Sequence, residues 1–212
     1  GITTHTGNLT ISETSTATIA ELVTINAATS GTVTLSTETI AANFSDTAAN
    51  LAAAFDGITT HTGTIGLSDG VAATIAELVT INAATSGTVT LNSQTIAANY
   101  SDTAVNLAAA FSGITTHTGN LTISETSTAT IAELVTINAA TSGTVTLSTE
   151  TIAANYSDTA ANLAAAFSGI TTHTGNLTIS ETSTATIAEL VTINAATSGT
   201  VTLSAETIAA NY

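Results

Sequence analysis

The chain has 212 residues, 15 acidic side chains and no lysine or arginine, which gives a formal charge of −15. Because binding to phosphate groups depends on lysine and arginine, this composition argues against nucleic-acid partners and against attachment to anionic lipid. Cysteine is absent, which excludes disulfides and thiolate metal sites. The sequence also has no run of about 18 apolar residues, so it does not predict membrane insertion.

The sequence repeats with a period of 56 residues, and the stretch GITTHTG opens every copy. The repeats are 1–56, 57–112, 113–168 and a partial 169–212. Such periodicity predicts a stacked array of repeats, so we expect the four to form one solenoid. Because the last copy stops inside a repeat, we expect the chain to be an excerpt of a longer protein.

The first predicted element in chain order is a strand at residues 8–12. Leu9 and Ile11 alternate there with Thr10 and Ser12, as expected for a strand with one buried face.

A helix is predicted next, in ATIAELVTINAATSG. Thr18 and Glu21 have the spacing of a capping box, in which each side chain bonds the backbone of the other residue. At the other end, Ser30-Gly31 predicts a stop at which glycine adopts the left-handed conformation. One helical face is predicted to carry Ile19, Leu22, Val23 and Asn26, flanked by Ile25.

A second strand, TVTLS, follows this helix. Val33 and Leu35 point to one side of it, and Thr32, Thr34 and Ser36 point to the other.

The second half of the repeat predicts another helix and another strand. Ser45 or Asp46 is positioned to cap the helix TAANLAAAF, whose apolar face is Ala48, Leu51 and Phe55. Gly57 and Gly63 bracket the loop ITTHT before the next strand. The segment TETIAANF, residues 37–44, is expected to add a short strand or a turn.

Each repeat therefore reads as helix–strand–helix–strand with parallel strands. Right-handed crossovers would place the helices on one face of the sheet. We expect an α/β-solenoid with some likeness to a leucine-rich repeat. The alternative is an all-β solenoid, in which IAELVTI and NLAAAF are strands too.

The stretches SDTAANLAAAFSGITTHTGNLTIS and ATIAELVTINAATSGTVTL resemble tandem repeats of very large bacterial extracellular proteins, including cyanobacterial surface proteins. The resemblance covers the whole chain. It implies a location outside the cell or on its surface, as part of an adhesin, sheath or filament. Calcium-binding nonapeptide repeats often accompany such proteins, but their G-G-x-G-x-D pattern is missing here.

Four histidines recur in T-T-H-T-G, namely His5, His61, His117 and His173. One reading is a metal or pH-sensitive site, but stacked copies about 9–10 Å apart cannot share one zinc ion. We expect a loop residue between helix and strand, at a contact between chains. No unique catalytic set stands out, so we expect no enzyme, no catalytic residues and no cofactor- or metal-binding residues.

Three other features recur. The acids Glu13, Glu21, Glu38 and Asp46 suggest either helix caps or divalent-cation sites, for example for calcium, between chains. Alternating threonines suggest an ice- or glycan-binding ladder, or simply β-propensity. Asn8-Leu-Thr10 and Asn43-Phe-Ser45 match the N-glycosylation pattern. A packing or lateral-contact ladder is expected at Phe44, Tyr100, Tyr156 and Tyr212.

From these features we expect a structural segment that forms or extends a filament, sheath or adhesin stalk. Its partners would be further copies, through fibres or end-to-end stacking, and glycan would be a second kind of partner. The alternative function is an ice- or glycan-binding adhesin surface that uses the threonine ladders.

Overall fold

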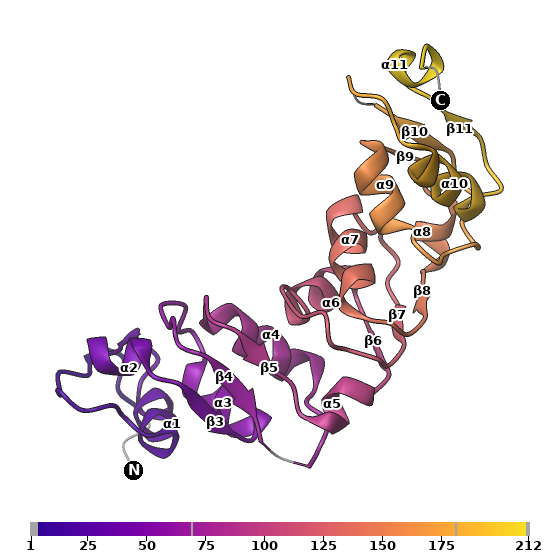
Figure 1. The fold of residues 1–212 in the computed structure, drawn as a ribbon. Coiled ribbons are helices and arrows are strands. Elements are labelled where there is room, and N and C mark those ends of the chain that lie inside the picture. Colours follow the sequence, from indigo (N-terminus) through magenta and orange to yellow (C-terminus); the bar gives the residue numbers. More distant parts are fainter. Residues whose placement is uncertain (1–3, 69, 181, 211–212) are drawn as a thin grey trace. The chain divides into compact units, whose positions relative to one another are not determined.

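A computed structural model of the chain describes residues 4–68, 70–180 and 182–210 (Figure 1). The chain divides into two compact units, Gly1–Ala98 with Ala109–Ile114 and Asn99–Ala108 with Thr115–Tyr212. Both are α/β, with helices alternating with short parallel strands in small sheets. This confirms the predicted α/β class and parallel strand direction.

Three kinds of helix recur with the repeat. The longest has ten residues: α1 Ile19–Ala28, α4 Ile75–Ala84, α7 Ile131–Ala140 and α10 Ile187–Ala196. A short one comes next: α2 Thr37–Ala41, α5 Ser93–Ala97, α8 Thr149–Ala153 and α11 Ala205–Ile208. The third kind is α3 Ala48–Phe55, α6 Ala104–Ala110 and α9 Ala160–Ala166.

Three kinds of strand recur as well. The first precedes the long helix: β1 Leu9–Thr10, β4 Ile65–Leu67, β7 Leu121–Ile123 and β10 Leu177–Ile179. The second follows it: β2 Val33–Thr34, β5 Val89–Thr90, β8 Val145–Thr146 and β11 Val201–Thr202. The third follows the short helix: β3 Phe44–Asp46, β6 Tyr100–Asp102 and β9 Tyr156–Asp158.

The strands form a two-stranded sheet, β1-β2, and three three-stranded sheets, β3-β4-β5, β6-β7-β8 and β9-β10-β11. The middle strand is always the one before the long helix. In the first compact unit, Ile65 is in register with Phe44 on one side and Val89 on the other. In the second, Leu177 is in register with Tyr156 and Val201.

The predicted helix–strand–helix–strand order was incomplete, because a full repeat has three helices and three strands. The segment TETIAANF supplies both extra elements, α2 and the first residue of β3. The hydroxyl of Ser36 caps α2 by accepting from the Thr39 amide. This cap explains why Ser36 is buried rather than on the polar side of a strand. The all-β alternative is wrong, because IAELVTI and NLAAAF are helical.

The predicted capping box is confirmed in all four long helices. The Thr18 hydroxyl accepts from the Glu21 amide, and the Glu21 carboxylate accepts from the Thr18 amide at 2.8 Å. The cap of α3 was predicted one or two residues too early, since the hydroxyl of Thr47 fills that position. Asp46 supports it instead, by accepting from the Thr47 amide at 2.7 Å.

The predicted role of Gly31 was wrong. Among the described residues, positive φ angles occur only at Gly57, Gly113 and Gly169, after the third kind of helix. Gly31 is required by close packing instead: a Cβ there would lie 2.4 Å from the carbonyl oxygen of Gly7. Helix α1 ends at Ala28, and the next residue, Thr29, is extended.

The core of each unit contains buried side chains from both the helices and the strands, and the helices pack against one another. In the first unit α3 packs against both α1 and α4, and in the second α9 packs against both α7 and α10. The predicted face of α3 is confirmed, since Ala48, Leu51 and Phe55 are buried together with Ala54. On the long helix the structure buries Ile81 completely, although its equivalent Ile25 was expected only to flank the apolar face.

Candidate functional site

Three of the four histidines lie in the core rather than at a surface between chains. His61, His117 and His173 are each 1% exposed, which contradicts the expected surface contact. Each precedes a strand and forms an isolated parallel bridge with the threonine after the long helix. Only His5, at the start of the first repeat, is exposed among the four.

Aromatic rings from the preceding repeat enclose the buried histidines. The His61 ring lies 5.4 Å from Phe44 and 5.0 Å from Phe55, measured between ring centroids. In the second unit, His173 lies 5.6 Å from Tyr156 and 4.7 Å from Phe167. The aromatic ladder is therefore a packing feature where it is described; its last predicted member, Tyr212, lies outside the described residues.

The His61 ring has a defined tautomer. Its Nε2 lies 2.9 Å from the carbonyl oxygen of Ala42, which can only accept, so Nε2 carries the proton. Its Nδ1 is buried and has no hydrogen-bond partner among the described residues. Burial lowers the pKa of His61, and the bond to Ala42 opposes this only in part. The ring is therefore neutral at pH 7.

The same balance holds for His173. Burial lowers its pKa, while the backbone of Thr151 and Ala154 faces the ring and acts in the opposite direction. A neutral imidazole inside an aromatic cage can pack and accept or donate one hydrogen bond. Within the described residues, no three His, Asp or Glu side chains come close enough to hold a metal ion.

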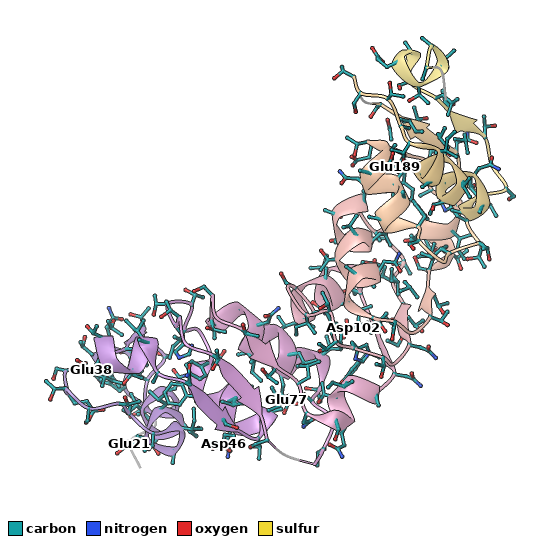
Figure 2. All side chains as sticks on the ribbon, in the orientation of Figure 1. Glu21, Glu38, Asp46, Glu77, Asp102 and Glu189 are labelled. Carbon is teal, nitrogen blue, oxygen red and sulfur yellow. The ribbon has the colours of Figure 1, made fainter. Side chains whose placement is uncertain are left out.

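Two of the four carboxylates singled out in the sequence, Glu21 and Asp46, bond the backbone; both are labelled in Figure 2. Glu21 accepts from both the amide and the hydroxyl of Thr18, and these bonds lower its pKa. Asp46 accepts from the Asn50 side chain at 2.9 Å as well as from its neighbour. Glu38 lies exposed in the first turn of α2, and Glu13 accepts from Ser15. No three of these four carboxylates come together among the described residues.

The outer face of each three-stranded sheet carries hydroxyl groups in register. In the second unit, Ser157, Thr178 and Thr202 form one such row across β9, β10 and β11. In the first unit the corresponding row is interrupted, because Gly66 lies between Ser45 and Thr90. Adjacent strands place these groups about 4.8 Å apart. The threonine alternation predicted from the sequence thus forms short polar rows.

The asparagines of the glycosylation pattern belong to a second row beside the hydroxyls. Asn155 Oδ1 accepts from the Asn176 amide at 2.7 Å, and Asn176 Oδ1 accepts from the Thr200 amide at 2.9 Å. Asn8 and Asn43 make the same kind of bond, to Thr32 and Thr64. Their side chains are exposed but already tie one strand to the next.

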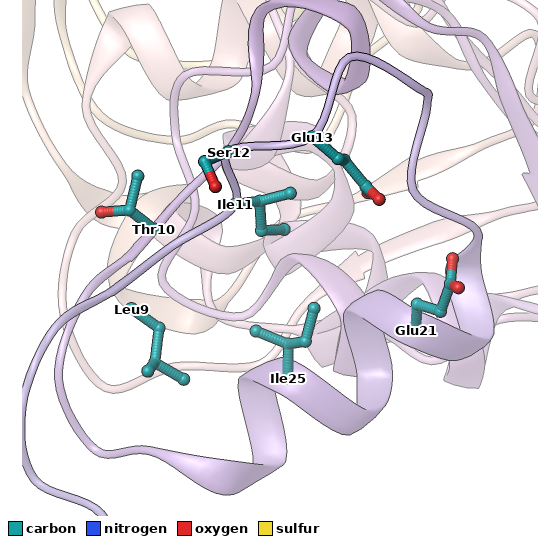
Figure 3. Close-up of a pocket in the computed structure, with 7 residues that line it drawn as sticks. All are labelled: Leu9, Thr10, Ile11, Ser12, Glu13, Glu21 and Ile25. Carbon is teal, nitrogen blue, oxygen red and sulfur yellow. The ribbon is translucent and has the colours of Figure 1, made fainter.

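An open groove of about 420 Å³ borders the first repeat (Figure 3). Leu9 and Ile11 line it from the strand side and Ile25 from α1, with Glu13 and Glu21 at its rim. These apolar side chains are half-buried.

The histidine–aromatic cluster was missed by sequence reasoning. Its signal is a fixed spacing: Phe44 and Phe55 precede His61 by constant numbers of residues, and Tyr156 and Phe167 precede His173 by the same numbers. Aromatic residues are only 3% of the chain, so their recurrence beside a histidine could have indicated a shared core position.

Comparison with protein-family models, curated proteins and solved structures finds no match for this chain. In the described part of the chain, no helix is both long and apolar enough to cross a membrane.

Proposed function

We propose that the chain is a structural segment of an extracellular repeat protein of the bacterial surface type. Its repeats would stack into an α/β-solenoid that forms or extends a filament, sheath or adhesin stalk. In such an array each repeat is stabilised mainly by its neighbours, so that linear cohesion is itself the function.

The observation that carries this proposal is that repeats share their cores. His61 belongs to the second repeat, but the two rings around it, Phe44 and Phe55, belong to the first. Across the same boundary, the amides of Thr62 and Gly63 in the second repeat donate to the carbonyl oxygen of Ile40 in the first, at 2.9 and 3.3 Å. The core and the backbone of neighbouring repeats are thus joined at this boundary.

The surface chemistry agrees with a structural role. Hydroxyl and amide groups dominate the outer rows, and only 7% of residues are charged. The histidines, which would be the obvious catalytic groups, are enclosed by hydrocarbon in the second and fourth repeats. We therefore propose no enzymatic activity.

Electron microscopy of the purified chain in negative stain tests the proposal. Uniform rods or fibres are expected, and compact round particles would contradict it. Antibodies raised against the chain should label intact source cells from outside. Labelling only after permeabilisation would contradict the extracellular location.

A second candidate is binding of ice by the hydroxyl rows. The in-register row Ser157, Thr178 and Thr202 supports it, because such a row can hold water molecules at a regular spacing. Glycan binding has less support, since the Phe and Tyr rings that could stack on sugars lie largely in the core. Inhibition of ice recrystallisation by the chain, lost in a Thr146→Lys/Thr202→Lys variant with unchanged circular dichroism, would establish this candidate. Absence of inhibition by the unaltered chain would reject it.

A further inference from the structure

The first repeat presents an incomplete piece of core. Leu9 and Ile25, at the groove of Figure 3, are half-buried. Their equivalents in the second repeat, Ile65 and Ile81, are 0% exposed. These positions are covered in the second repeat and partly exposed in the first. The segment that covers them in the second repeat therefore shows what kind of segment would cover them in the first.

That segment is a strand followed by a helix. In the first compact unit, β3 pairs with β4 and α3 packs on α4. In the second compact unit, β9 pairs with β10 and α9 packs on α10. The two segments read FSDTAANLAAAF and YSDTAANLAAAF, so one chemistry covers both.

The backbone of β1 is ready for such a strand. The amides of Leu9 and Ile11 donate to the carbonyl oxygens of Thr32 and Thr34 in or beside β2, each at 2.9 Å. Since amides alternate in direction along a strand, those of Thr10 and Ser12 face the opposite edge.

The equivalent edge is paired in later repeats. The Ser68 amide donates to the carbonyl oxygen of Asp46 at 3.0 Å, and the Ser180 amide donates to that of Asp158 at 3.0 Å. An unpaired strand edge of this kind is a template for another strand.

A carboxylate at the rim adds a polar match. In the second compact unit, Glu125 accepts from the amide of Ala104, the first residue of α6, at 3.1 Å. Its equivalent in the first repeat is Glu13, which the structure bonds to the Ser15 hydroxyl at 3.4 Å. Glu13 is thus positioned to accept from the first turn of an incoming helix, where a negative charge is favourable.

We infer that residues 8–13 together with Ile25, the first-repeat face, form a docking surface for one strand–helix segment with the chemistry of residues 152–168. The segment contributes a strand to the open edge of β1, and the Leu and Phe of its helix fill the groove. The inference rests on the proposed function, because it names the contact by which repeats would join.

The test adds this segment to the complete chain. Residues 152–168 are fused directly before Gly1, so that the junction repeats the natural Ser168-Gly169 sequence. Hydrogen exchange of the Thr10 and Ser12 amides is then followed by NMR. We expect at least about 100-fold slower exchange than in the unextended chain, because a docked strand protects them. Exchange unchanged within about twofold would overturn the inference.

Two matched variants make the result specific. Leu163→Asp within the added segment, and Ile25→Asp on the receiving face, should each remove the protection. Ile25 is half-buried, so the unextended Ile25→Asp chain should keep its circular dichroism spectrum. Protection that survives both variants would contradict docking on this face. The proposed function would still stand if only this test failed, since the paired edges of later repeats do not depend on it.

Discussion

The Nε2 of His61 donates a hydrogen bond of 2.9 Å to the carbonyl oxygen of Ala42, a residue of the preceding repeat. This bond joins the loop before β4 to the end of α2. It also fixes the ring between Phe44 and Phe55. The buried histidine therefore connects two repeats, and protonation of its ring should weaken the contact between them.

Stability should fall with acidification as the buried histidines titrate. Burial lowers the folded-state pKa of His61 and His173 below the unfolded value of 6.5. Their contribution is therefore fully present above pH 6.5 and is lost as pH falls through the folded pKa. Each contributes a slope of at most about 1.4 kcal/mol per pH unit to the free energy of unfolding. Urea unfolding at a series of pH values between 7.5 and 5.5 measures this pH dependence of the free energy of unfolding.

The matched variants for this slope are His61→Gln and His5→Gln. Replacing His61 should flatten the pH dependence, because its buried ring no longer titrates. His5→Gln is the control, because His5 occupies the equivalent position of the first repeat but is exposed. Equal effects of both variants would show that the buried ring is not responsible.

Glycines of the second repeat should differ sharply in their tolerance of a side chain. A Cβ on Gly63 would lie 1.8 Å from the Ala42 carbonyl oxygen, whereas the nearest atom to one on Gly66 is 3.7 Å away. We expect Gly63→Ala to cost about 3 kcal/mol or more, through overpacking. Gly66→Thr should stabilise by about 0.5–1 kcal/mol, since threonine suits a strand and glycine does not. Thermal unfolding of both variants tests this prediction. Equal shifts of the melting temperature in the two variants would contradict it.

A single hydroxyl distinguishes two equivalent core positions. The Tyr156 hydroxyl donates to the carbonyl oxygen of Ala129 at 2.7 Å, and burial raises the pKa of Tyr156 to about 12. The equivalent residues of the first repeat are Phe44 and Ala17. Tyr156→Phe should lose about 1 kcal/mol of unfolding free energy and Phe44→Tyr should gain a similar amount. Chemical denaturation that moves both variants in one direction would argue against this bond.

The local elements could be predicted from the sequence where one residue pattern has one physical solution. The Thr18–Glu21 spacing specifies a capping box, and Leu51 and Phe55 mark a helical face. The groups that serve contacts between segments far apart in the sequence could not be assigned this way. Gly31 reads as a helix stop, but its lack of a side chain is needed for a neighbour 24 positions away, Gly7. His61 reads as a polar loop residue, and only the rings of another repeat make it a core residue.

The short elements show a related limit. The segment TETIAANF has too few residues for a periodic pattern to appear, so α2 and β3 could only be foreseen as a strand or a turn. Their positions depend on long-range bonds, such as that from the Ala17 amide to the buried Thr39 hydroxyl at 3.0 Å.

Salt should stabilise the chain without regard to the identity of the cation. The chain has a charge of −15 and no lysine or arginine to offset it. Salt ions that screen the repulsion between its carboxylates should therefore favour the folded state. Each kcal/mol gained should raise the melting temperature by about 2–4 °C. Calcium chloride and magnesium chloride should raise the melting temperature equally at equal ionic strength. A rise specific to calcium would reveal structural cation sites instead.

The most direct test of linear cohesion is how the size of the chain grows with repeat number. A second copy of residues 1–168 placed before Gly1 continues the repeat in register and gives 380 residues (168 + 212). Small-angle X-ray scattering then compares this chain with the original. If repeats stack in a line, the radius of gyration should rise roughly 1.8-fold, in proportion to length. A rise of only about 1.25-fold, as for a compact globule of increasing size, would contradict the account.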